Sequence, residues 1–135
     1  MKIERAGRWL FAGILVSGIL HLAMSRLYAR IIPPIFPRPI LLVLISGAAE
    51  ILGGAGLLVP RFRRPAAYGL AILLVAVYPA NIYMAVYHIP SSGLIGNRWL
   101  QWLRLPLQLP LIWWALYYAR RTAVLAAAPT ADPPR

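Results

Sequence analysis

The sequence places a single carboxylate, Glu50, in the middle of an apolar, glycine-rich stretch. The chain has only three acidic residues, and the other two, Glu4 and Asp132, lie in its polar ends. The stretch from Ile40 to Val59 is about long enough to cross a bilayer, at roughly 20 residues per span. A carboxylate at that depth is too short to reach the interface, so it must be protonated or paired. Glu50 is therefore the predicted catalytic residue, an acid or base that exchanges protons with a ligand.

The other apolar stretches each carry polar side chains at a similar predicted depth. A rise of about 1.5 Å per residue places Glu50 near the bilayer midplane and the other groups in the outer half. If the apolar faces contact lipid, the polar groups must face one another. The sequence therefore predicts a ligand-binding pocket, in which Glu50 faces Arg104, His21 or both. The predicted ligand-binding residues are His21, Glu50, Asn81, Arg104 and Gln108.

Each of these residues also has a structural interpretation. Arg104 could extend to the outer interface, Asn81 and Gln108 could hydrogen-bond between helices, and a buried ion pair could fix helix register. His88 lies near a predicted helix end, which disfavours a bis-histidine haem site with His21. Two histidines and one buried acid also make a poor metal site, so no metal is expected.

The composition assigns these stretches to a membrane. Apolar residues make up 61% of the 135-residue chain, against about 45–50% in soluble domains. A soluble protein of this size could not bury so much apolar surface. The net charge of +11 comes from basic residues at the ends of apolar runs, as in headgroup anchors, so a nucleic-acid partner is not expected. The absence of cysteine excludes thiol chemistry and disulfides in this chain.

The order of apolar runs predicts an all-α membrane protein, a four-transmembrane-helix antiparallel up-down bundle in residues 1–121. The predicted helices cover about residues 9–28, 40–59, 66–88 and 98–121. Four prolines in residues 29–39 predict a cap over the mouth of the pocket, and the Ala/Pro-rich residues 122–135 predict a disordered tail. Trp9 and Tyr28 are predicted as interfacial anchors. The positive-inside rule favours both termini in the cytoplasm, since nine of the fourteen basic residues then lie on that side.

Several motifs occur in an order that resembles a known family. Residues 46–60 read SGAAEILGGAGLLVP; His21 and Pro33-Pro34 precede them, and Arg63-Arg64, PANIYM (79–84) and RLPLQ (104–108) follow. This order resembles the DoxX family of small four-helix bacterial membrane proteins over about residues 8–120. The resemblance implies a bacterial inner-membrane location and a link to quinone-coupled enzymes such as thiosulfate:quinone oxidoreductase. Glu50 and Asn81 match positions in the family motifs.

The resemblance and the predicted pocket together predict a quinone- or lipid-binding subunit of a membrane oxidoreductase system. A quinone head is apolar with two acceptors, which suits an aliphatic pocket with few donors. The sequence contains no redox centre, so electrons would come from a partner subunit, and whether the chain is itself an enzyme stays open. The alternatives are a lipid isomerase-like enzyme, a small proton-coupled transporter, and a structural or partner-binding bundle. The expected partners are membrane lipid and either an oxidoreductase subunit or a second copy of the chain.

Overall fold

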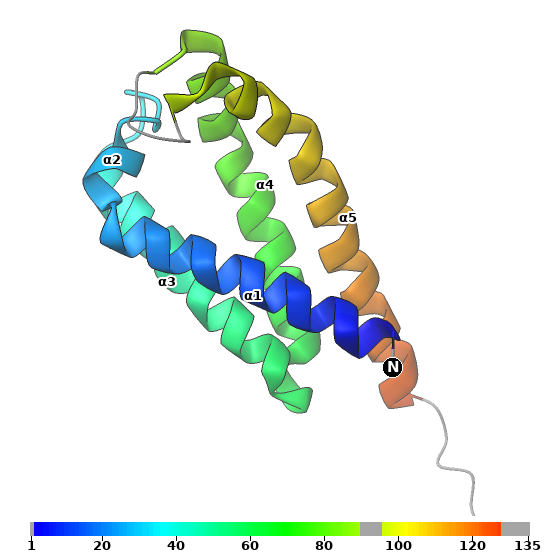
Figure 1. Cartoon of the computed structure of the whole chain (residues 1–135). Helices are drawn as coiled ribbons and strands as arrows, with labels where there is room; N and C mark the ends of the chain where they lie inside the picture. The colour runs from blue at the N-terminus through cyan, green and yellow to red at the C-terminus, as the bar shows by residue number, and fades with distance from the viewer. Residues whose placement is uncertain (1, 90–95, 128–135) are drawn as a thin grey trace, which may run out of the picture.

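A computed structural model describes residues 2–89 and 96–127. The elements in these residues are α1 (Lys2–Ala23), α2 (Ser25–Ala29), α3 (Pro39–Leu58), the 3-10 helix η1 (Pro60–Phe62), α4 (Arg63–Tyr87) and α5 (Arg98–Ala127). The four long helices alternate in direction, so the N-terminus and the end of α5 lie at the same end of the molecule (Figure 1). The predicted all-helical fold is confirmed for the described residues.

The observed helices correct several predicted boundaries. The predicted helix 9–28 is divided at Met24, which leaves the helical conformation, and residues 25–29 form the separate helix α2. The helix predicted to begin at residue 66 begins at Arg63, because Pro65 fits in a first turn, where no backbone N–H donor is needed. Helix α5 continues to Ala127, so the first residues of the predicted tail are helical. Residues 128–135 of that tail, and residues 90–95 of the loop before α5, lie outside the described residues.

The long helices form two antiparallel pairs. Helix α1 packs along α3, α4 packs along α5, and α3 also contacts α4. At one end of the bundle all four helices meet in an apolar cluster, the four-helix cluster, formed by Leu10, Leu57, Ala67, Leu70, Tyr118 and Ala119. Away from this cluster the pair α1–α3 diverges from the pair α4–α5 (Figure 1).

A second apolar cluster, the α2 cluster, joins the helix pairs near their other end. It consists of Tyr28 from α2, Ile31 from the following turn, Val43 from α3 and Met84 from α4. The division of the chain at Met24 lets α2 turn toward α4, which buries Tyr28 and Ile31 to 6% exposure each. Tyr28 is therefore not the exposed interfacial anchor that the sequence predicts, whereas Trp9 is 72% exposed.

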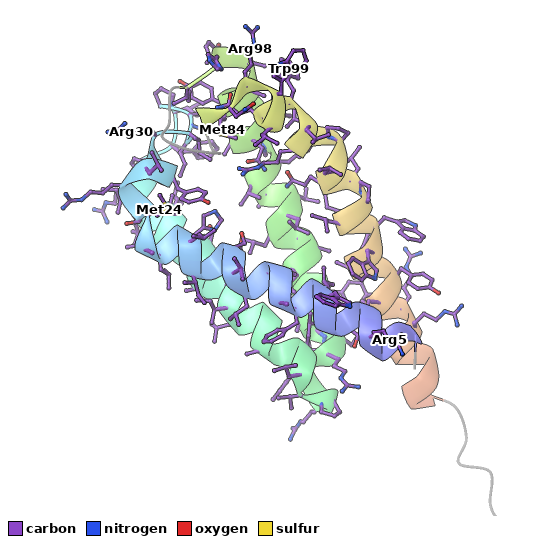
Figure 2. All side chains as sticks on the ribbon, in the orientation of Figure 1. Arg5, Met24, Arg30, Met84, Arg98 and Trp99 are labelled. Atoms are coloured by element: carbon purple, nitrogen blue, oxygen red, sulfur yellow. The ribbon has the colours of Figure 1, made fainter. Side chains whose placement is uncertain are left out.

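Charged and aromatic side chains mark the two ends of the bundle. Arg30, Arg98 and Trp99 lie near the end that carries α2, and Arg5 lies toward the opposite end (Figure 2). The faces between these ends are apolar, with Leu52 of α3 at 73% exposure and Ile72 of α4 at 70%. Exposed apolar surface of this extent is typical of proteins that contact a membrane or a partner.

Two helical segments are long and apolar enough to cross a membrane. They are Pro39–Leu58, with a mean hydropathy of 2.0, and Pro60–Tyr87, with a mean hydropathy of 1.9. Within α1, Trp9–Ala23 forms a shorter apolar helix. By length and composition, α3 and the continuous segment η1–α4 are therefore the candidate membrane spans among the described residues.

Candidate functional site

A cavity of about 820 Å³ lies between the two helix pairs, with walls from α1 to α5 and from the turn after α2. Ile31, Ile32 and Phe36 of the proline-rich segment form part of the wall, and most of the lining is aliphatic. Polar side chains project from both helix pairs. All five residues that the sequence predicts for the site line this cavity: His21, Glu50, Asn81, Arg104 and Gln108. Their convergence on one cavity is observed, and their role in binding or catalysis stays a prediction.

Close packing of α1 on α3 positions Glu50. The buried residues of α3 recur every three or four positions, at Val43, Gly47, Glu50, Gly54 and Leu57, and so share one face. A Cβ atom added at Gly47 would lie 2.9 Å from the Cβ atom of His21 and 3.0 Å from the carbonyl oxygen of Gly18 in α1. The glycines next to Glu50 therefore serve helix packing rather than open space for a ligand.

The glycine contact brings His21 and Glu50 together at the cavity wall. The Nδ1 atom of His21 lies 3.2 Å from the Oε2 atom of Glu50. This distance suits an ion pair, but the two atoms are poorly aligned for a hydrogen bond, and neither has a hydrogen-bond partner among the described residues. The contact is therefore electrostatic, and Glu50 is only 7% exposed. Of the two partners predicted for Glu50, His21 is the one in contact.

Tyr28 is a site residue that the sequence analysis missed. Its ring lines the cavity and packs edge-on against the ring of His21, with centroids 4.4 Å apart and an angle of 82° between the ring planes. Tyr28 also lies within electrostatic reach of both Arg104 and Glu50. The sequence carries no clear signal for this contact, because the chain leaves the helical conformation at Met24, between His21 and Tyr28.

Asn81 and Gln108 hydrogen-bond with each other across α4 and α5. The Asn81 side-chain amide donates to Oε1 of Gln108 at 2.6 Å, and Nε2 of Gln108 donates to the carbonyl oxygen of Leu74 at 2.5 Å. Gln108 is 4% exposed, so these bonds are made largely away from solvent. The pair therefore forms the interhelical hydrogen bonds that were its structural interpretation, while still lining the cavity.

Replacing Gln108 with leucine is expected to destabilise the protein by about 1–2 kcal/mol, because the change leaves partly buried polar groups of Asn81 and Leu74 unsatisfied. Chemical unfolding followed by circular dichroism measures this loss. Tyr78→Phe is the matched control, since it removes a longer bond between the same helices, from the Tyr78 hydroxyl to the carbonyl oxygen of Leu105 at 3.4 Å. An equal or smaller cost for Gln108→Leu would show that the amide pair does not hold α4 to α5.

Arg104 lines the cavity from the wall formed by α4 and α5, opposite the wall that carries Glu50. Its guanidinium forms no ion pair with Glu50 and no hydrogen bond with another residue of the described ranges. Because the guanidinium of Arg104 has no such partner, it is a donor group available to a bound molecule. Arg104 lies about 9 Å along α5 from Arg98, at 1.5 Å per residue.

The remaining histidine lies apart from this cavity. His88 ends α4 in a left-handed backbone conformation, its side chain is exposed, and it does not line the cavity that holds His21. The arrangement does not bring the two histidines together for a haem. Among the described residues, no group of three or more His, Cys, Asp or Glu side chains could hold a metal ion.

Comparison with known families covers nearly all of the described chain. The family model of a domain of unknown function, DUF8561, matches residues 10–119. The chain belongs to the DUF8561 family. The match runs from α1 to α5, so the cavity-lining residues of this DUF8561 chain lie within the family domain. Neither the curated proteins nor the solved structures provide a match to the chain, and the resemblance to the DoxX family stays a prediction.

Proposed function

We propose that this DUF8561 protein spans the membrane four times and binds a quinone or another lipid between its helix pairs, as a subunit of a membrane oxidoreductase system. The observation that supports this function best is the largely aliphatic cavity of about 820 Å³. One wall carries the His21–Glu50 pair, and the opposite wall carries Arg104. A pocket with an apolar lining and a few polar groups is the usual form of a small-molecule site.

The exposed apolar faces support the membrane location. Only 28% of the apolar window in α3 and 22% of that in η1–α4 is buried inside the protein, whereas a core helix of a soluble protein is mostly buried. Helix α5 has 30 residues and is about 45 Å long, which exceeds the bilayer core. With α1 and α5 as the other two spans, both termini lie in the cytoplasm under the positive-inside rule. The DoxX resemblance favours the bacterial inner membrane.

In the proposed complex the cavity residues have different tasks. Glu50 exchanges protons with the ligand, and His21, 3.2 Å away, stabilises its charge or shares its proton. Arg104 and Tyr28 have groups that can donate hydrogen bonds to a ligand oxygen. A bound quinone would supply electron transfer, with a partner subunit as the electron source. The amides of Asn81 and Gln108 bond to each other and keep the α4–α5 wall in place.

Lipid analysis of the purified protein tests this proposal. We expect protein purified in mild detergent to retain quinone or lipid, detected by mass spectrometry of an organic extract, and expect Glu50→Gln and Arg104→Leu to lose it. Arg98→Leu is the control, because Arg98 is an exposed arginine of the same helix that does not line the cavity. If Glu50→Gln and Arg104→Leu keep the same molecules as the wild type, the cavity is not the binding site. An absorption spectrum with a Soret band would instead indicate a haem.

The His21–Glu50 pair gives specific support to one alternative, a lipid isomerase-like enzyme. The Nδ1 atom of His21 and the Oε2 atom of Glu50 are both without hydrogen bonds, and both residues line an apolar cavity, as a proton-shuttling acid and base would. An isomerase would change the chromatographic retention of an added lipid without changing its mass. An oxidoreductase subunit would leave the lipid unchanged until its partner and an electron donor are present.

A further inference from the structure

Arg104 is a cation in a largely apolar cavity, and no described residue serves as its counter-ion. The chain has three acidic residues, of which Glu4 and Asp132 lie near its ends and Glu50 contacts His21. Arg104 is partly buried and forms no ion pair with a described residue. A positive charge held away from water without a partner is costly, and an anion brought by a ligand would offset that cost.

The hydrogen-bonding groups that face the cavity favour an anion as well. The amide of Gln108 is committed to Leu74 and Asn81, so it has little left to offer a ligand. The hydroxyl of Tyr28 forms no hydrogen bond with another described residue, and it lies within electrostatic reach of Arg104. The groups available for a ligand oxygen near Arg104 are therefore donors. A guanidinium and a phenol that line the same cavity are suited to a carboxylate or a phosphate.

A stripe of exposed leucines on α5 lines one side of the cavity. Leu100, Leu103, Leu107 and Leu111 follow one another at spacings of three and four residues, so they share a face of α5. These leucines line the cavity and remain 39–54% exposed. Helix α1 packs on α3 and not along α5, so none of the described helices covers the stripe between the two clusters. An apolar chain can therefore leave the cavity sideways over these leucines.

We infer that the cavity binds an anionic amphiphile, whose carboxylate or phosphate contacts Arg104 and Tyr28 and whose apolar chain leaves over the leucine stripe of α5. This inference rests on the proposed function and narrows its ligand from lipids in general to acidic ones. A free fatty acid and an acidic phospholipid share this chemistry. The ligand enters from the bilayer, because the leucine-lined side of the cavity is apolar.

A fluorescent fatty acid tests the inference. We expect cis-parinaric acid to bind wild-type protein in a neutral detergent. Arg104→Gln should weaken this binding about tenfold or more, because the variant loses a charged, hydrogen-bonded contact with the ligand. Tyr28→Phe keeps the ring that packs on His21 and removes the hydroxyl, so it should weaken binding to a lesser extent. Arg98→Gln removes the same charge from an exposed site and should leave binding unchanged within about twofold.

Competition experiments distinguish the ligand sources and the outcomes. Displacement of the probe by palmitate or by phosphatidic acid identifies which acidic lipid the site prefers, and either result supports the inference. Equal displacement by hexadecanol or decylubiquinone, together with unchanged probe binding to Arg104→Gln, would overturn the inference and leave the proposed function standing. Failure of acidic and neutral amphiphiles alike to bind would overturn both. Arg104→Lys, which keeps the charge, should recover part of the affinity and so separates loss of charge from loss of fold.

Discussion

Replacing His21 with leucine is expected to destabilise the protein by about 3–5 kcal/mol, because the change leaves the carboxylate of Glu50 buried without a partner. Glu50 is 7% exposed, and its Oε2 atom has no hydrogen-bond partner among the described residues that could replace the imidazole. The side chain of Tyr28, packed edge-on against His21, loses contacts as well. Unfolding of detergent-solubilised protein in a denaturing-detergent titration, followed by circular dichroism, measures the loss.

A double substitution separates the ion pair from simple packing. His21→Leu with Glu50→Leu replaces both charged groups by apolar ones, and such replacements of buried pairs are often nearly neutral. We therefore expect the double variant to be more stable than His21→Leu alone, by about 2 kcal/mol or more. The control is His88→Asn, which removes the other histidine of the chain from an exposed site, tolerates the left-handed backbone there, and should change stability by less than about 0.5 kcal/mol.

Two results would contradict this account of the pair. A cost of His21→Leu no larger than that of His88→Asn would show that Glu50 is stable in the folded protein without the imidazole. A double variant less stable than His21→Leu alone would show that the two positions lose packing independently. In either case Glu50 would not depend on His21, and its proposed proton exchange would need another partner.

The convergence of the five polar residues could be predicted from the sequence because each lies deep in an apolar helix. Polar groups at that depth avoid lipid by facing one another. Counting residues along each helix gives the depth of each group. Depth does not determine how each helix is rotated about its axis. The sequence therefore left Arg104 and His21 as equal candidates for the partner of Glu50, and the contact between Gly18 and Gly47 selects His21.

Tyr28 shows where prediction from local pattern fails. An aromatic residue at the end of an apolar run is typical of an interfacial anchor. The division of the helix at Met24 instead directs Tyr28 toward Met84 of α4. Met84 is far from Tyr28 in the sequence, so a local pattern cannot predict their contact. No residue near Met24 signals this break, since the prolines that end the helical region come later, at Pro33 and Pro34.

The other large effect is expected at the contact between α1 and α3. A Cβ atom added at Gly18 would lie 2.8 Å from the carbonyl oxygen of Gly47, 2.9 Å from the side chain of Ile51 and 3.1 Å from the Cβ atom of Glu50. Backbone and Cβ atoms cannot rotate away, so Gly18→Ala must push the two helices apart. Overpacking of this kind costs about 1–3 kcal/mol, and we expect a value near the upper end because α1 and α3 are packed along their length.

Gly13→Ala is the matched control for this prediction, because it makes the same substitution in the same helix with no atom within 4 Å of the new methyl group. Alanine is favoured over glycine in a helix by about 1 kcal/mol, so Gly13→Ala should be neutral or stabilising. Gly18→Ala should also separate His21 from Glu50 and lower ligand retention, although residue 18 does not line the cavity. If the Gly18→Ala variant is as stable as the Gly13→Ala variant and retains as much ligand, the α1–α3 contact does not position the acid–base pair.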